Sequence, residues 1–382
     1  MHRLLPLLLF SLFQQNARAQ ASQQANLTST RGPGNLTVNP AGDYDLSQIG
    51  TLASSGNTTY KNPIMSVKAG DPWMTTYDSY YLFTFSTNSN ITLKRSHSLT
   101  SNWDFAETKV VFNPDPDGGQ PWSLNLWAPE IHRFGDRWYI IFSPSIDGDD
   151  PNPLQDAMCP YACPAINHRM YVLESSGPDP WESEYTVKSE LSTFDSFAID
   201  GTYMTYGDKL YHLYSCWEHP YDGWPANLCI TTLSNPWTTA STLTQRRLLS
   251  VPRESWEQVP PGRYPRLATN EGPAQLTNPY TNQTFVVYSA ARVNTPFYCL
   301  GLLELVGNDP MQPQNWKKHT DGCVFSQNTV EGVYGTGHAS FVRTLGDGDT
   351  YVVYHALTTD DPGRKSASTA SLSNLSANQP PF

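Results

Sequence analysis

The sequence predicts an all-β fold, and specifically a five-bladed β-propeller. Two observations lead to this prediction: a composition rich in turn formers and aromatic residues, and a strand motif that recurs five times. The chain of 382 residues contains 25 Gly and 31 Pro, with 11 Trp and 21 Tyr. This composition is typical of many short strands joined by turns, and it excludes a helical bundle.

Each copy of the repeat is a turn followed by an alternating aromatic run. The copies occupy residues 78–86, 135–143, 207–215, 281–289 and 348–356. After each of the first four copies come a second apolar run and a turn that ends in Trp: Trp103, Trp181, Trp237 and Trp316. A unit that cannot bury both faces alone must stack on its neighbours, so five units stacked radially form a five-bladed propeller. A β-sandwich with similar hairpins is the alternative.

The N-terminal region has the pattern of a secreted protein. Residues 1–19 combine a basic start, an apolar run and a small-residue cleavage site, which indicates a signal peptide. Residues 20–58 are rich in Ser, Thr and Asn without hydrophobic periodicity, and we expect a glycosylated arm or linker. The catalytic propeller is expected over 59–357. No later run is long enough to span a bilayer, so we expect an extracellular protein.

Charge and sequons support this location. Acidic residues outnumber basic ones 35 to 24, a net charge of −11, which argues against nucleic acid as a partner. No apolar span suggests a membrane partner either, and we expect a monomer. Six Asn-x-Ser/Thr sequons are compatible with a glycoprotein. They begin at Asn26, Asn35, Asn57, Asn90, Asn282 and Asn374.

Six cysteines in an exported chain permit up to three disulfide bonds. Two pairings are attractive because each pair flanks an expected hairpin: Cys216 with Cys229, and Cys299 with Cys323. Cys159 and Cys163 would close a tight loop. A metal site formed by this last pair with His168 lacks a matching second pair of ligands, so it is the weaker interpretation.

Polar residues precede every aromatic run, at the place where the inner strand of a blade lines the central channel. They are Asp71, Glu130, Asp200, Glu271 and His338. Each alone could be a turn residue or a satisfied core residue, and a wet pore lined by structural acids is a further alternative. Their recurrence at one place in the repeat favours a cluster of acids, which would shift one another's pKa values as acid and base chemistry requires.

Clustered carboxylates in a secreted, aromatic-rich protein indicate glycoside hydrolysis. No nucleotide-binding, phosphate-binding or serine-nucleophile motif competes with this interpretation. Trp73 and Trp127 each lie close in sequence to one of the acids, and their flat faces could bind sugar rings. With Glu130 they are the predicted substrate-binding residues. The chemistry requires no cofactor.

The motifs NPIMSVKAGDPWM, LWAPEIHRFGDRWYIIFS, FAIDGTYM, NEGPAQL and VYGTGHASF resemble those of glycoside hydrolase family 43, in family order, from about residue 60 to 356. The resemblance implies a five-bladed propeller and an inverting mechanism. In it Asp71 is the general base, Glu271 the general acid, and Asp200 the residue that raises the pKa of the acid. Inversion predicts that the two catalytic carboxyl groups lie about 6.5–9.5 Å apart. His338 resembles a histidine beside a structural calcium ion.

Within the family, these motifs look most similar to exo-acting α-L-arabinofuranosidases, which release arabinose from arabinan. The expected substrates are therefore oligosaccharides of arabinan or arabinoxylan. β-Xylosidases and endo-arabinanases use the same acids, and a propeller that only binds carbohydrate is a further alternative. Loops at 144–168 and 216–229 are candidates for closing one end of the cleft, which would favour exo action.

The C-terminal segment departs from the resemblance. Residues 358–382 are Ser-rich, with almost no β-branched or aromatic residues. We expect this tail to be disordered, which would leave the fifth blade incomplete and expose a strand edge.

Overall fold

The computed structural model describes residues 61–66, 69–145, 167–219, 225–260, 268–278, 281–346, 348–360 and 368–374. The predicted signal peptide (1–19) and arm (20–58) lie outside the described residues. So does most of the 144–168 loop and part of the 216–229 loop. Within the described ranges, no helix is long and apolar enough to cross a membrane.

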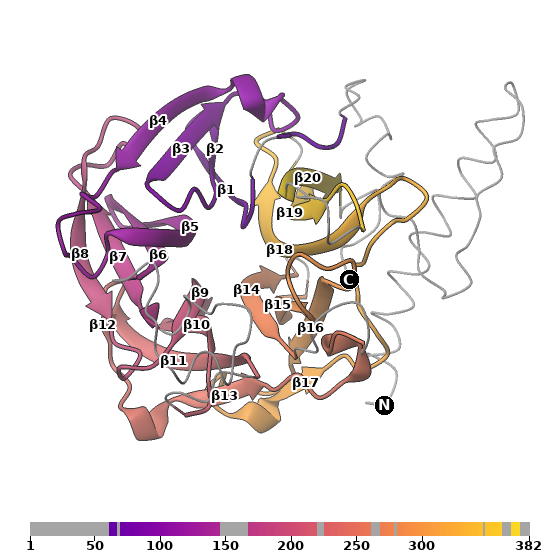
Figure 1. The fold of residues 1–382 in the computed structure, drawn as a ribbon. Helices are drawn as coiled ribbons and strands as arrows, with labels where there is room; N and C mark the ends of the chain where they lie inside the picture. The colour runs from indigo at the N-terminus through magenta and orange to yellow at the C-terminus, as the bar shows by residue number, and fades with distance from the viewer. Residues whose placement is uncertain are drawn as a thin grey trace, which may run out of the picture.

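Five antiparallel sheets are arranged around a central axis (Figure 1). Blade I contains β1 (Trp73–Tyr77), β2 (Tyr80–Thr84), β3 (Ile91–Ser96) and β4 (Glu107–Phe112). Blade II contains β5 (Leu124–Phe134), β6 (Arg137–Ser145), β7 (Met170–Ser175) and β8 (Tyr185–Leu191). Blade III contains β9 (Ala198–Tyr206), β10 (Lys209–Cys216), β11 (Asn227–Asn235), β12 (Thr238–Thr239) and β13 (Arg247–Ser250). Blade IV contains β14 (Asn270–Thr277), β15 (Thr284–Ala290), β16 (Cys299–Leu305) and β17 (Trp316–Lys318). Blade V contains β18 (Tyr334–Arg343), β19 (Thr350–Leu357) and β20 (Ser368–Asn374).

The first strand of each blade is innermost, and neighbouring inner strands contact one another around the axis (Figure 1). The predicted propeller is therefore confirmed, and the sandwich alternative is wrong. Four short 3-10 helices lie in the described connections: η2 (Trp103–Phe105), η4 (Leu243–Gln245), η5 (Ser255–Glu257) and η6 (Pro313–Asn315). Among the predicted turn tryptophans, Trp237 directly precedes β12 and Trp316 begins β17. Trp103 and Trp181 each lie four residues before the outer strand of their blade.

The core is divided among the five junctions between blades. Each junction holds one hydrophobic cluster built from both of its blades. The alternation of strand side chains explains this division, because successive residues point to opposite faces of a sheet. In β2, Phe83 belongs to the junction with blade V, whereas Leu82 belongs to the junction with blade II. The aromatic runs of the repeat therefore fill two junctions each.

Blade V is closed by the N-terminal end of the described chain. β20 pairs with β19 in antiparallel register, and Met65 forms a bridge with Ala370 on the other edge of β20. The Asn62 side chain forms two hydrogen bonds with the backbone of Leu372. Its Nδ2 donates to the Leu372 carbonyl at 2.8 Å, and its Oδ1 accepts the Leu372 N–H at 2.9 Å. Chain segments from the two ends thus meet at the junction of blades V and I.

This closure corrects the prediction for the tail. Disorder over 358–382 is wrong for residues 368–374, which form β20. Few residues of this strand favour β structure intrinsically, but Ala370 and Leu372 are fully buried in the cluster between blades V and I. Tertiary packing outweighs weak strand propensity here. Blade V has three strands in the described chain, and residues 62–65 cover the edge that the prediction left exposed.

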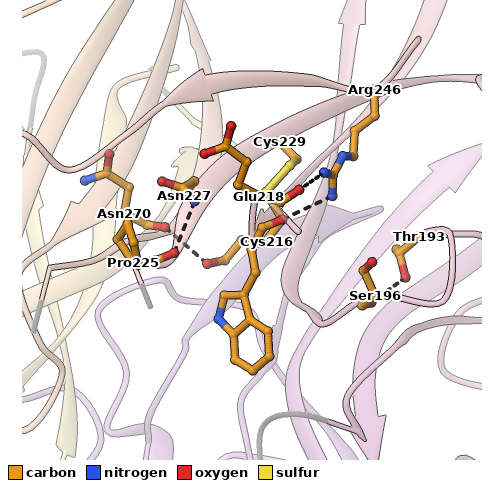
Figure 2. Close-up of a disulfide and its surroundings, with 11 residues drawn as sticks. Thr193, Ser196, Cys216, Glu218, Pro225, Asn227, Cys229, Arg246 and Asn270 are labelled. Atoms are coloured by element: carbon orange, nitrogen blue, oxygen red, sulfur yellow. Dashed lines mark hydrogen bonds between the residues drawn. A yellow bond between two sulfur atoms is a disulfide. The ribbon is translucent and has the colours of Figure 1, made fainter. Parts of the chain in front are cut away.

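Both predicted hairpin disulfides are present. Cys216 bonds Cys229 across β10 and β11 (Figure 2), and the Cα separation is 6.0 Å. Cys299 bonds Cys323, with a Cα separation of 5.9 Å. Cys159 and Cys163 lie outside the described residues. His168 is completely buried, its Nδ1 lies 2.9 Å from the Ser143 carbonyl oxygen, and its ring stacks on Trp127. It is therefore packed in the blade II core.

Candidate active site

Four of the five inner strands carry a β-bulge. In β14, for example, Glu271 pairs with Ser289 and the next pair joins Ala274 to Val287, so two residues of β14 face one of β15. β5, β9 and β18 show the same irregularity. In each bulged strand, the residue after the pair that begins the bulge has a positive φ. Asp71, two residues before β1, has the same conformation. These residues are Asp71, Ala128, Asp200, Gly272 and His338.

The bulges define which positions are equivalent. Asp71, Asp200 and His338 occupy the same place in their blades. Glu271 precedes that place by one residue and Glu130 follows it by two. The prediction of a single shared position is therefore wrong for the two glutamates. A bulge changes the direction of its side chains, so the offset of one or two residues places the two glutamates differently from Asp71, Asp200 and His338 relative to the bulge.

His338 lies between two of the acids. Its Nδ1 is 3.1 Å from Oδ1 of Asp71 and 3.8 Å from Oδ2 of Asp200. The Gly272 N–H donates to the same Asp200 oxygen at 3.2 Å, which links the group to the residue after Glu271. Asp200, Glu271 and His338 are each 6–8% exposed. The structure thus brings these predicted residues into one buried cluster.

Asp71 and His338 stabilise each other's charged forms. Burial alone would raise the pKa of Asp71, but the adjacent His338 and a hydrogen bond from Ser86 hold it well below its usual range. Burial alone would lower the pKa of His338, but Asp71 and Asp200 raise it to about 10. Asp71 is therefore a carboxylate, and His338 an imidazolium, at neutral pH.

Glu271 and Asp200 are shifted in the opposite direction. Burial, reinforced by the charge of Asp200, raises the pKa of Glu271 to about 8. Burial also raises the pKa of Asp200 to about 6, with His338 opposing the shift and Asp71 adding to it. Glu271 therefore holds a proton at neutral pH while Asp71 does not. Pairs of acids separated in this way can divide the roles of acid and base.

Glu130 lies beside this cluster and is paired with His132. Its Oε2 is 2.8 Å from the His132 Nε2, and burial raises its pKa although that contact opposes the shift. The Trp73 ring lies against His132 with centroids 4.5 Å apart, and its indole N–H donates to the Ile131 carbonyl at 3.0 Å. Trp73 therefore packs between blades I and II. Trp127 is half-buried on His168. Sugar contacts by these three residues remain predictions.

Three residues that the motifs did not single out contact the acids. The Ser86 hydroxyl donates to Asp71 Oδ2 at 2.5 Å and accepts the Ala128 N–H at 2.7 Å. The Asp71 N–H donates to Nδ1 of His355 at 3.2 Å. Tyr298 is hydrogen-bonded to Glu271. A signal for two of them was present, because the aromatic runs end in Ser86, Ser143, Ser215 and Ser289, with His355 at the matching place.

Two glycines make room for these contacts. Gly272 has a φ of +53°, and a Cβ there would lie 3.1 Å from the His338 ring. Gly337 lies against Tyr298, and a Cβ would approach that ring to 2.3 Å, far inside van der Waals contact. Both positions therefore require Gly for steric reasons, and Gly272 requires it for its backbone conformation as well.

Calcium takes six to eight oxygen ligands. Among the described residues there is no group of three or more His, Cys, Asp or Glu side chains that could hold a metal, and the calcium ion beside His338 stays a prediction. Nδ1 of His338 faces Asp71, and the imidazolium itself supplies positive charge between the two carboxylates.

Comparison with known proteins agrees with this geometry. An extracellular exo-α-(1→5)-L-arabinofuranosidase from Streptomyces chartreusis is 31% identical over 78% of this chain and 82% of its own length. A protein of the same description from Streptomyces avermitilis is 29% identical over 80% of this chain, which spans 58% of that relative. The crystal structure of an α-L-arabinofuranosidase from Lactobacillus brevis superposes with a TM-score of 0.70, at 27% identity, over 85% of this chain and 96% of that one.

A profile of the family described as glycosyl hydrolases family 43 matches residues 60–374, which include all five blades and β20. The five-bladed fold, the carboxylates around His338 and the sequence relatives agree on one assignment. The chain belongs to glycosyl hydrolases family 43 and is a glycoside hydrolase.

Proposed function

We propose that this protein is a secreted, inverting exo-α-L-arabinofuranosidase that releases L-arabinose from arabinan or arabino-oligosaccharides. The observation that carries the proposal is the opposite pKa shift of two acids in one buried cluster. Asp71 is held ionised beside His338, and Glu271 is held protonated near Asp200. Hydrolysis of a glycosidic bond with inversion requires one base and one acid in these states.

The reaction assigns one proton transfer to each carboxyl group. Asp71 takes a proton from a water molecule as the water oxygen attacks the anomeric carbon. The bond from that carbon to the leaving oxygen breaks, and Glu271 gives its proton to the leaving oxygen. Asp200 keeps the pKa of Glu271 high through its negative charge. The predicted 6.5–9.5 Å between the two catalytic carboxyl groups leaves room for the water.

Arabinose specificity is supported by the relatives rather than by the acids. The two sequence relatives and the L. brevis structure are all described as arabinofuranosidases. The same acids could serve a β-xylosidase or an endo-arabinanase, because loops around the cleft determine which substrate enters. Trp73, Trp127 and Glu130 are the proposed sugar contacts. The proposed partner is the carbohydrate substrate of a monomeric enzyme.

Secretion is supported by the N-terminal pattern and by the extracellular relatives. Disulfides between Cys216 and Cys229 and between Cys299 and Cys323 agree with an oxidising compartment. The proposed chemistry uses three carboxyl groups and water, without a cofactor. Treatment with EDTA followed by dialysis tests whether a metal contributes to activity.

The decisive experiment is a proton NMR time course on linear arabino-oligosaccharides, run beside xylo-oligosaccharides. We expect arabinose to appear first, in the β configuration, and then to mutarotate. Arabinose released first in the α configuration would contradict inversion. Release of xylose, or of internal fragments, would replace the arabinofuranosidase assignment with one of the related activities. Tight oligosaccharide binding in calorimetry without any product would indicate a binding propeller.

A further inference from the structure

A second buried carboxylate lies outside the catalytic cluster, between blades III and IV. Glu257 ends the short helix η5 and is completely buried. Its Oε1 accepts hydrogen bonds from the Tyr288 hydroxyl at 2.8 Å and from Lys318 Nζ at 2.7 Å. Its Oε2 accepts the Glu254 N–H at 3.0 Å. A buried charge with a counter-ion and several donors is fixed in place.

The same carboxylate also holds the residue before the proposed general acid. Asn270 Nδ2 donates to Glu257 Oε1 at 2.9 Å, and Asn270 is fully buried at the start of β14. Its Oδ1 accepts the Ser250 hydroxyl at 2.5 Å, and its carbonyl accepts the Ser215 hydroxyl at 3.1 Å. Its N–H donates to the Ala226 carbonyl at 2.9 Å. Asn270 is therefore held from several sides.

These contacts tie the start of β14 to blade III. Ser215 directly precedes the segment closed by the disulfide between Cys216 and Cys229, and Ala226 lies within it. Asn270 lies beside this segment in Figure 2. Glu257 adds the connection to Lys318 on the outer strand β17. One continuous set of hydrogen bonds thus runs from the outer edge of blade IV to the residue that precedes Glu271.

We propose that Glu257 is a positioning residue, which acts through Asn270 to hold Glu271 against the leaving oxygen. The inference rests on the proposed function of Glu271 as the general acid. Proton donation needs the acid within hydrogen-bond reach of the leaving oxygen, and a displacement of 1 Å can reduce the rate by about 10²-fold. Asn270 directly precedes Glu271 in the chain, so a displacement of Asn270 would move Glu271 directly.

Leaving-group dependence distinguishes this role from a purely structural one. Natural arabinosyl linkages need protonation of the leaving oxygen, whereas an aryl arabinofuranoside with an acidic phenol does not. For Glu257→Gln we expect kcat/KM to fall about 10–100-fold on arabinobiose and less than about 3-fold on 2-chloro-4-nitrophenyl α-L-arabinofuranoside. Loss of stability alone would reduce both rates by the same factor.

The matched control is Tyr185→Phe. Tyr185 is buried in the outer strand of blade II, and its hydroxyl donates to the Pro180 carbonyl at 2.9 Å. Its removal costs a buried hydrogen bond far from β14, so the melting temperature should fall while the ratio of the two rates stays unchanged. If Glu257→Gln does not fold, Asn270→Ala keeps the bonds of Glu257 to Lys318 and Tyr288 and should show the same selective loss.

Glu271→Gln separates the two possible failures. If that variant loses both activities equally, or is inactive on both substrates, the general-acid assignment is wrong, and with it the proposed function. If Glu271→Gln is selective but both Glu257→Gln and Asn270→Ala lose the two activities equally, the positioning role is overturned and the catalytic assignment stands. Selective loss in all three variants supports the proposal.

Discussion

Glu257 and Glu271 are two buried glutamates in neighbouring segments with opposite surroundings. Glu257 accepts hydrogen bonds from three side chains and one backbone N–H, and one of the donors is the ammonium group of Lys318. Glu271 lies near the carboxyl group of Asp200 and is hydrogen-bonded to Tyr298, and its pKa is raised to about 8. The fold compensates the charge of the first acid and favours the protonated form of the second, as a proton donor requires.

The largest effect should come from removing the acid whose charge is stabilised within the channel. Asp71→Asn should reduce kcat by about 10³-fold or more on both arabinobiose and the activated aryl arabinofuranoside, because water attack needs a base in either case. Asn also tolerates the φ of 55° at this position. Steady-state kinetics on both substrates measure the effect. Retained activity on the aryl substrate would exclude Asp71 as the base.

Glu271→Gln tests the other side of the comparison. The rate on arabinobiose should fall about 10²–10⁴-fold, and that on the aryl arabinofuranoside less than about tenfold, because only the natural linkage needs the proton. Initial rates on the two substrates, at equal enzyme concentration, give the ratio. Equal loss on both substrates would contradict the assignment of Glu271 as the general acid.

Asp200→Asn tests why the pKa of Glu271 is raised. Wild-type kcat/KM on arabinobiose should decrease as the pH rises through about 8, because Glu271 then loses its proton. The charge of Asp200 raises that pKa, so its removal should move the basic limb to lower pH by about one unit, equivalent to about 1.4 kcal/mol. Full pH profiles of both proteins check this. A basic limb that stays at the same pH would show that the charge of Asp200 does not contribute to the raised pKa of Glu271.

The last effect concerns stability rather than rate, and it should have opposite signs at the two glutamates. Lys318→Met leaves the buried carboxylate of Glu257 without its counter-ion and should lower the free energy of unfolding by about 3 kcal/mol. Glu271→Gln removes a carboxyl group whose charge is poorly compensated and should leave that free energy unchanged or higher. Denaturant unfolding of both variants measures the difference. Equal destabilisation would contradict the comparison.

Much of the fold could be predicted because the signal is periodic. The five aromatic runs became the second strands of five blades, and alternation along each run became packing in two junctions. β20 was missed because Ser368–Asn374 contains no aromatic residue and only one large aliphatic one. Its strand is stabilised by pairing with β19 and by the contact with Met65, and neither partner is near it in sequence.

The candidate site was predicted in part for a similar reason. Asp71, Asp200 and His338 share one bulge position, so a search by repeat finds them. Tyr298 lies outside the strands of the repeat. Its contact with Glu271 depends on the absence of a side chain at Gly337, against which the Tyr298 ring packs. Glu257 has no counterpart in the repeat, and only the packing of blades III and IV brings it to Asn270.

The sequence by itself predicted five blades, the two described disulfide pairings and a set of acids at the inner strands. Only the tertiary structure decided which acid is protonated, which is ionised and how the ring closes. The physical reason is that pKa values follow from burial and from distances between charges, and these arise when strands far apart in the chain meet. A repeat encodes the place of a residue within its blade, whereas the partners of that residue come from the neighbouring blades.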